Sequence, residues 1–322
     1  MRQSERRSCL SVKIRLGRPT AAGLRPGKVK MQKKDSRHRF ILEKTRVRGV
    51  LVRLDATWKE VLSRADYPPN VQQILGHAMA AIPLLTSTIK FTGKMTLQAR
   101  GTGPLTLLVV QGNADGGQRG LARWKAEPPL SPLEKILGDA TLTIQIESGE
   151  AGDVYQGVVG IAGDFLQDAL ADYFENSEQL PTRLWLCCGE GQVAGLMLQQ
   201  LPSEDEDNNE DDWNRVNLLA DTIEQEELFE KEVGKLLGQV FAEEDVRLFD
   251  SEPLCFECGC SRERTAGLIA GIGYEEAIDI LKKEGQIEIT CEFCNSVNTF
   301  DSIDVEAIFR GAGNEGDQET VH

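Results

Sequence analysis

The sequence predicts an α+β protein with three parts: an N-terminal mixed α/β sheet domain, a helical, charged linker and a small C-terminal cysteine-rich module. Three observations lead to this prediction. Short apolar runs with glycine-containing turns, interrupted by a few helical segments, fill residues 31–202. An acidic run, SEDEDNNEDD, follows at 203–212. Most of the cysteines then lie within residues 255–294.

The N-terminal part begins with an amphipathic segment and a strand and continues with helices. Thr57 is a candidate cap for a helix through Leu62, and YPPN predicts a turn at 67–70. Apolar residues at helical spacing then predict a second helix over Val71–Leu85.

Strands dominate the rest of this part. Apolar runs with glycine turns predict strands over 89–93, 94–101, 104–112, 117–125, 140–148 and 155–163. A helix over Asp164–Phe174 and a hairpin of residues 183–189 and 192–202 complete it. Residues 31–202 are therefore expected to form one α+β domain.

The segment 203–254 is predicted to be an acidic linker with metastable helices. Residues 203–212 have no apolar side chain, which is typical of a solvated linker. Residues 213–243 have helical periodicity, but their apolar stripes are modest and acidic residues are abundant. Such helices need a neighbouring surface for stability.

The two ends of the chain differ from the rest. Residues 1–30 are basic, with Glu5 as the only acidic residue among them. A mis-assigned start, with initiation at Met31, is the favoured interpretation of this leader, and an organelle transit peptide is the alternative. Residues 311–322 are polar and are expected to form a disordered tail.

Composition excludes several classes of protein. A formal net charge of −15 disfavours a general nucleic-acid binder, which needs clustered Lys and Arg. The longest apolar runs, such as LTLLVV at 105–110, are too short to span a membrane. The leader lacks the apolar core of a signal peptide. Cysteines clustered in a large acidic protein indicate a thiolate metal site in a reducing, cytoplasmic compartment.

The C-terminal cysteines have the spacing of a zinc site. CFECGC at 255–260 and CEFC at 291–294 are two close groups, and a predicted helix over 274–285 and a strand over 286–290 separate them. Four thiolates on one Zn²⁺ form a closed tetrahedral site without an open position for water. The segment is therefore expected to fold as a four-cysteine zinc module rather than as a catalytic metal site.

Spacing leaves two ligand registers open. Cys255 and Cys258 would form a zinc knuckle, with Gly259 and Asn295 free to adopt positive φ after each pair. The competing register uses Cys258 with Cys260. In both registers Cys291 and Cys294 supply the second pair.

The sequence resembles the heat shock protein 33 family, also known as 33 kDa chaperonins. CGCSRER and EGQIEITCEFC resemble the metal-binding signature of that family. RGVLVRL, DYPPNVQQIL, LTSTIKFTG, GQRGLAR, YQGVVGIAGD and YFENSEQLPTRL resemble its N-terminal domain in the same order. The resemblance runs from about Met31 to Phe309.

The resemblance implies specific roles for the cysteines. Cys258, Cys260, Cys291 and Cys294 become the ligands of one zinc ion per chain in the reduced state, and Cys255 becomes a spare thiol. Oxidation is expected to form the disulfides Cys258–Cys260 and Cys291–Cys294, with release of zinc and unfolding of residues 255–310. The charged helices of the linker would then loosen.

The resemblance also implies a function. It is that of an ATP-independent holdase chaperone, not an enzyme, that binds unfolded client proteins after oxidation and protects them from oxidative and heat aggregation. The active form is expected to be a homodimer, without a nucleic-acid or membrane partner. In agreement, the sequence has no G-x-x-x-x-G-K-[ST] motif for ATP.

Other interpretations of the same residues remain. The chain could be a thiol–disulfide oxidoreductase that uses C-x-x-C, or a zinc-ribbon protein with a static structural site. A zinc-ribbon nucleic-acid binder would need a basic segment 255–310, which is acidic here. Cys187 and Cys188 have no role in the zinc interpretation; they lie in the apolar run RLWLCC, and one is expected to pack in the core while the other faces outward. Arg262 and Arg264 are expected to pair with the thiolates or with carboxylates of the linker.

Overall fold

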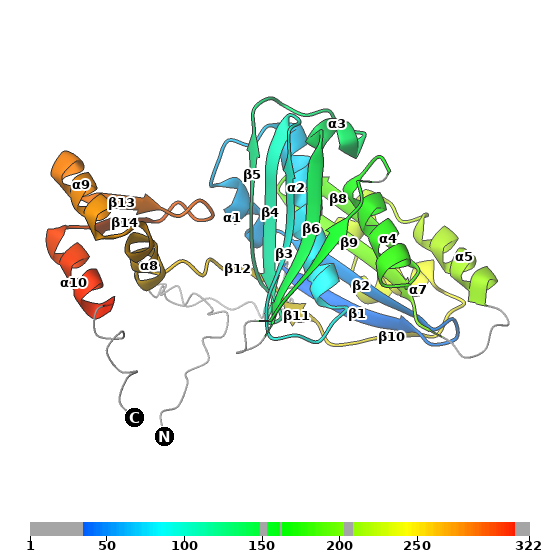
Figure 1. Ribbon diagram of the computed structural model, residues 1–322. Coiled ribbons are helices and arrows are strands. Elements are labelled where there is room, and N and C mark those ends of the chain that lie inside the picture. The colour runs from blue at the N-terminus through cyan, green and yellow to red at the C-terminus, as the bar shows by residue number, and fades with distance from the viewer. Residues whose placement is uncertain (1–34, 149–152, 162, 203–208, 313–322) are drawn as a thin grey trace, which may run out of the picture.

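The computed structural model of the chain describes residues 35–148, 153–161, 163–202 and 209–312. Figure 1 shows a large body, formed by the N-terminal part and the linker, and a small C-terminal module beside it. The leader 1–30 and most of the tail lie outside the described residues. The predicted α+β fold class is confirmed, because the body contains two six-stranded sheets with separate helices between and around them.

The first sheet joins strands from the two ends of the N-terminal part with two short strands from the linker segment. Its order is β10-β1-β2-β9-β8, and β11 also pairs with β1. All these pairs are antiparallel. The strands are β1 (Ser36–Leu42), β2 (Val47–Leu54), β8 (Thr182–Gly189), β9 (Gln192–Gln200), β10 (Val246–Leu248) and β11 (Glu252–Pro253).

The second sheet combines a meander of β3, β4 and β5, a hairpin of β6 and β7, and one added strand. Its order is β12-β5-β4-β3-β6-β7, so β6 pairs with β3 after a crossover from β5. The pairs among β3 to β7 are antiparallel, whereas β12 lies parallel to β5, with Cys255 opposite Gly117. The strands are β3 (Gly93–Gly101), β4 (Leu105–Asn113), β5 (Gly117–Trp124), β6 (Ala140–Ser148), β7 (Asp153–Val159) and β12 (Cys255–Phe256).

One long helix fills the space between the two sheets. Most of α2 (Pro69–Thr86) is buried, and it contacts strands of both sheets. Glycines in the strands allow this close approach: a Cβ on Gly120 would lie 2.6 Å from Met79 Sδ. The remaining helices of this part are α1 (Ala56–Leu62), α3 (Leu133–Leu137) and α4 (Leu166–Ser177).

The linker helices cover the outer face of the first sheet. They are α5 (Asn209–Ala220), α6 (Gln225–Glu230) and α7 (Val233–Val240). Leu236 and Leu237 of α7 are fully buried, in one cluster with Phe40 and Leu51 of the sheet. Burial of this kind contributes about 1.5–3 kcal/mol per large side chain, so the helices depend on the sheet.

The C-terminal module has its own small core. It consists of α8 (Arg262–Ile272), α9 (Tyr274–Glu284), the hairpin of β13 (Ile287–Thr290) and β14 (Val297–Phe300), and α10 (Ser302–Ala312). Five side chains form the buried part of this core: Ile269, Ala277, Ile287, Phe300 and Val305. A core of this size needs additional stabilisation, such as a metal.

Several local predictions were wrong. Residues 89–92 do not form a strand, and β3 begins at Gly93. The acidic run is not a linker throughout, because α5 begins at Asn209, where three acidic residues in its first turn favour the helix N-terminus. Thr57 does not cap α1: it lies inside the helix, and Asp35 accepts hydrogen bonds from the N–H groups of Ala56 and Thr57.

Candidate metal centre

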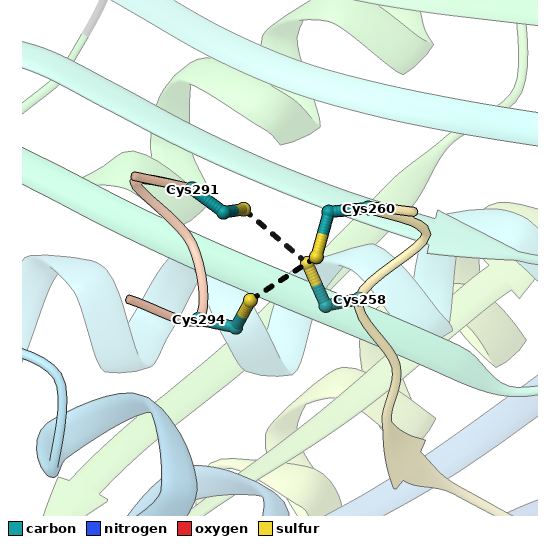
Figure 2. Close-up of side chains that lie close together, drawn as sticks. All are labelled: Cys258, Cys260, Cys291 and Cys294. Carbon is teal, nitrogen blue, oxygen red and sulfur yellow. Dashed lines mark hydrogen bonds between the residues drawn. The ribbon is translucent and has the colours of Figure 1, made fainter. Parts of the chain in front are cut away.

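The four cysteines come from two loops of the C-terminal module. Cys258 and Cys260 lie in the extended segment between β12 and α8, and Cys291 and Cys294 lie in the turn between β13 and β14. Figure 2 shows their sulfur atoms pointing toward one another. All four Sγ atoms lie within 4.8 Å of one another, so they are positioned to bind a metal ion.

The distances fit a tetrahedral metal. Cys260 Sγ lies 3.2 Å from Cys294 Sγ, and Cys258 Sγ lies 3.6 Å from Cys291 Sγ. Four sulfurs at the usual Zn–S distance of about 2.3 Å would be about 3.8 Å apart. A donor set made only of sulfur is typical of zinc and of iron–sulfur sites.

The backbone of the second loop has the conformation of a knuckle. Asn295 N–H donates to the Cys291 carbonyl at 2.8 Å, and Cys291 N–H donates to the Ser296 carbonyl at 2.9 Å. Asn295 has a φ of 55°, as predicted for the residue after the second cysteine. Asn tolerates this left-handed conformation better than most residues.

The first loop is not a knuckle. Gly259 is not among the described glycines with positive φ, so that prediction was wrong. The reason is that the loop continues into Cys260 and the N-terminus of α8, where Ser261 Oγ accepts a hydrogen bond from Arg264 N–H. Cys255 lies outside the group of four sulfurs, in β12, where its N–H donates to the Gly116 carbonyl at 3.0 Å.

The two arginines of SRER hold the module together rather than contacting sulfur or the linker, contrary to the prediction. Arg262 donates to the Thr299 carbonyl and to Asp304, both at 2.7 Å. Arg264 donates to the Gly259 carbonyl at 2.8 Å. These bonds tie the first cysteine loop to α8 and α8 to the hairpin.

The cation beside the cysteines comes from the N-terminal part instead. Arg119 of β5 donates from Nη1 to Cys258 Sγ at 3.2 Å, and its guanidinium lies 4.1 Å from the centre of the Phe293 ring. Sequence reasoning did not single out this residue. The only available signal was its place in GQRGLAR, one of the segments of the family resemblance.

Without a metal, the thiols of the cluster differ in pKa. Burial raises the pKa of Cys294, but hydrogen bonds with Ser296, Cys260 and Cys258 together outweigh that effect and lower the pKa to about 6. Ser296 also lowers the pKa of Cys260, but burial and hydrogen bonds with the neighbouring thiols outweigh this effect and raise the pKa to about 12. Burial raises the pKa of Cys291 as well. A metal that needs four thiolates must therefore displace protons.

Cys187 and Cys188 are not part of this site. They are consecutive residues of β8, and their side chains join different apolar clusters, Cys187 that of the linker helices and Cys188 that around α2. Burial raises the pKa of Cys187 to about 11 and that of Cys188 to about 12. Both thiols are therefore protonated at neutral pH and unreactive.

Among the helices of the described ranges, none is both long and apolar enough to cross a bilayer.

Comparison with known proteins gives a family model and several similar sequences. Residues 35–301 match the family model described as "Hsp33 protein". A 33 kDa chaperonin of Nitrosococcus oceani is 46% identical over 279 residues, which cover 87% of this chain and 96% of that protein. A 33 kDa chaperonin of Pseudomonas aeruginosa (strain LESB58) is 40% identical over 298 residues, covering 91% of this chain and 100% of that protein.

A solved structure has a similar fold. The crystal structure of a 33 kDa chaperonin (heat shock protein 33 homolog) from Thermotoga maritima matches with a TM-score of 0.74 and 21% sequence identity. The match covers 87% of this chain and 99% of that one.

Proposed function

The chain belongs to the Hsp33 protein family, and from this premise we propose that it is an ATP-independent holdase chaperone that is switched on by oxidation of its cysteine cluster. The family makes the chain a chaperone. The switch is the part that we propose. The observation that supports it most is a cluster of four cysteine sulfurs, without another ligand type, in a module with a very small core.

We assign Cys258, Cys260, Cys291 and Cys294 as the ligands of one zinc ion in the reduced protein. Bound zinc would contribute on the order of 10 kcal/mol to folding of the module. The residues themselves close the site: each loop supplies two thiols, and Ser261 and Asn295 fix the two backbone turns that present them. Cys255 is proposed to be a spare thiol.

The proposed activating step is oxidation of these ligands to disulfides. Two thiolates lose two electrons and form one S–S bond, while hydrogen peroxide takes these electrons and two protons from solvent and becomes two molecules of water. The pairs proposed are Cys258–Cys260 and Cys291–Cys294. A cleft lined by Arg119, Glu257 and Gly259 opens beside the first loop and gives a small oxidant access to it.

Oxidised cysteines no longer offer thiolate ligands, so the module loses its main source of stability. The proposed consequence is unfolding of residues 255–310 and undocking of the linker, residues 203–254. The linker helices cover a large apolar face of the first sheet, formed by side chains such as Phe40, Leu51 and Leu196. Exposed apolar surface of this extent is the kind of surface that binds unfolded chains.

The proposal also covers the role of the N-terminal domain, the oligomeric state and the cellular compartment. Residues 31–202 form the client-binding and dimerisation domain, the active form is a homodimer, and the protein works in the reducing cytoplasm. No step requires catalysis by the protein. A thiolate site that is stable only while reduced suits such a compartment.

The proposal is tested by comparing the reduced, zinc-loaded protein with the same protein after peroxide treatment. Thiol titration, zinc release to a chromogenic chelator and light scattering of an aggregating client are measured on each sample. The oxidised form is expected to lose four thiols and one zinc per chain and to suppress scattering. Equal protection by the reduced form would show that no redox switch exists.

One observation favours a second candidate function, a thiol–disulfide oxidoreductase. Cys260 directly precedes Ser261, the N-cap of α8, and a helix N-terminus favours a thiolate, although burial and the neighbouring thiols raise the pKa of Cys260 to about 12. Cys291 does not share this setting, because it follows the strand β13 and lies in a turn. Steady turnover of a disulfide substrate with a dithiol reductant would support this candidate, and a stoichiometric reaction without turnover would exclude it.

A further inference from the structure

The body contacts the C-terminal module at the loops that carry the cysteines. Figure 1 shows the turn between β13 and β14 pointing toward α1 and β5. Three arginine positions of the body form this docking face: Arg119 donates to Cys258 Sγ, Arg123 forms an ion pair with Glu292, and the Arg64 carbonyl accepts a hydrogen bond from Asn295 at 2.7 Å. The docking face therefore lies directly against the cluster.

Arg119 is held in place by the second sheet. Its Nε and Nη2 donate to Gln111 Oε1 at 2.9 and 2.7 Å, and Gln111 Nε2 donates to Thr96 Oγ1 at 3.0 Å. This chain of hydrogen bonds crosses β3, β4 and β5. It aims Nη1 at the sulfur of Cys258, so the guanidinium is positioned by groups that do not depend on the module.

The contact between Arg119 and Cys258 depends on the charge of the sulfur. Four thiolates around a divalent cation carry a net charge of −2, whereas a guanidinium stays positive at every relevant pH. A hydrogen bond between such partners is stronger than one between neutral groups. A disulfide sulfur carries no charge and is a weak acceptor, so oxidation of Cys258 would remove this attraction.

The neighbouring contacts lack this dependence. Arg123 and Glu292 form an exposed ion pair whose charges do not change when cysteines are oxidised. The stacking of Arg119 on Phe293 adds attraction that is also independent of the sulfur, although it needs the loop of Cys291 and Cys294 to stay folded. Among the contacts described, the one to Cys258 is thus the direct link between sulfur chemistry and docking.

We propose that Arg119 is a positioning residue through which the body recognises the reduced cluster: it stabilises the four thiolates and holds the module against β5, and it releases the module when Cys258 becomes part of a disulfide. The oxidation is the balanced step given above, in which two thiolates reduce one hydrogen peroxide to two molecules of water. The inference rests on the proposed role of the four cysteines as metal ligands.

The test compares two arginine variants of the full-length, reduced, zinc-loaded protein. Arg119→Gln removes the cation at Cys258, and Arg123→Gln, on the same strand, removes the exposed ion pair as a matched control. Zinc affinity is measured by competition with a chromogenic chelator. We expect Arg119→Gln to weaken zinc binding by about tenfold or more, as loss of an outer partner of a metal ligand does. Arg123→Gln is expected to change it by less than about twofold.

Docking is measured separately by amide hydrogen exchange. The N–H groups of Cys255 and Glu257 donate to the Gly116 and Gln118 carbonyls of the body, so their protection reports whether β12 stays on β5. Arg119→Gln is expected to speed their exchange in the reduced state to the rate seen in the peroxide-treated wild-type protein. Arg119→Lys keeps the positive charge but not the planar guanidinium. It is expected to retain part of the zinc affinity and part of the exchange protection that Arg119→Gln loses.

Each outcome decides the matter. Equal zinc affinity of Arg119→Gln, Arg123→Gln and the wild type would overturn the inference while leaving the proposed function intact. Failure of the wild type to bind zinc would overturn the proposed function itself. Should Arg119→Gln fail to fold, Gln111→Leu carries the test, because it removes the acceptor that aims Arg119 Nη1 at Cys258 and is expected to weaken zinc binding about two- to threefold. An unchanged affinity in that variant would also reject the role of Arg119.

Discussion

At the scale of single residues, the assignment of the metal ligands separates Cys255 from Cys260. Cys255 lies in a strand outside the group of four sulfurs, whereas Cys260 Sγ is 3.2 Å from Cys294 Sγ. Cys255→Ser is therefore expected to keep one zinc per chain. Cys260→Ser removes a ligand and is expected to weaken binding by more than about 100-fold, beyond the effect of losing an outer partner.

The measurement for this pair is zinc content and chelator competition after purification under reducing conditions. The two variants make the same chemical change five positions apart, so each is the control for the other. Loss of zinc from Cys255→Ser, with retention by Cys260→Ser, would restore the knuckle register of Cys255 and Cys258.

The pKa of His77 predicts how the stability of the protein depends on pH. His77 lies in α2 and is 7% exposed, and burial lowers the pKa of its imidazole from 6.5 to about 4. The unfolded chain therefore binds more protons than the folded chain between these values. Stability from this residue is fully present above pH 6.5 and is lost as the pH falls toward 4. At pH 5 the loss amounts to about 2 kcal/mol.

His77→Gln removes this titration and isolates it from other acid effects. The free energy of unfolding in urea is measured for both proteins at about pH 7.5 and at pH 5. On this change of pH the variant is expected to lose about 2 kcal/mol less than the wild type. Acid effects on the cysteine cluster are common to both proteins and cancel in the comparison. Parallel losses would show that His77 is not buried in its neutral form.

At the scale of elements, the proposed switch makes the docking of the linker helices the step that would set how easily the chaperone is activated. Leu237 of α7 is fully buried against the first sheet. Leu237→Ala is expected to destabilise the docked linker by about 2–5 kcal/mol. We therefore expect the reduced, zinc-loaded variant to suppress client aggregation without oxidation, measured by light scattering.

The adjacent residue offers a control with the opposite effect. A Cβ on Gly238 would contact nothing within 4 Å, so Gly238→Ala adds helix propensity to α7 without a clash. This change is expected to stabilise α7 by about 0.5–1 kcal/mol and to slow activation by peroxide. Activity of the reduced Leu237→Ala protein equal to that of the reduced wild type would contradict the proposed role of the linker.

Elements whose formation depends on their own residues were predictable from the sequence. Elements that form only by pairing with a distant segment were not. The apolar spacing of α2 and the glycine turns between the meander strands lie within the segments themselves. The strands β10, β11 and β12 are two or three residues long and exist only because β1 and β5 accept them. Helix α8 buries only Thr265 and Ile269, so its sequence has no clear apolar stripe.

The same contrast between local and distant causes applies to the candidate metal site. Spacing identified the cysteine loops and left two registers, because CFECGC contains both C-x-x-C and C-x-C. The fold favours the register of Cys258 with Cys260, since Cys255 lies in β12, outside the group of four sulfurs. Arg119 was not predictable from local pattern, because it precedes its partner Cys258 by 139 positions.

At the scale of the whole molecule, one continuous segment connects the linker, both sheets and the cluster. After α7 the chain adds β10 and β11 to the first sheet and β12 to the second, and two residues later it reaches Cys258. Glu252 of β11 forms ion pairs with Arg37 and Arg39 of β1. We therefore expect loss of order at the cluster to be transmitted along the backbone into β12, β11 and β10 at the edges of both sheets.

This arrangement predicts which parts of the molecule respond to removal of the metal. A chelator under reducing conditions is expected to unfold the module, because its five buried side chains cannot replace about 10 kcal/mol of metal binding. Exchange protection should disappear from β13 and β14 and from α8 to α10. It should remain in α2 and β9, which lie in the core between and within the large sheets.

Amide hydrogen exchange followed by mass spectrometry checks this prediction, with re-added zinc as the control for reversibility. The protection of β12 from hydrogen exchange distinguishes two ways in which the cluster and the linker can be coupled. If it is lost with the module while β1 and β2 remain protected, the cluster holds the connecting segment on β5, and the linker has its own threshold for release. Simultaneous loss from β12 and from α5 to α7 would mean that cluster and linker form one cooperative unit. A module that stays protected without metal would contradict the prediction, because its folding would then not depend on the four cysteines.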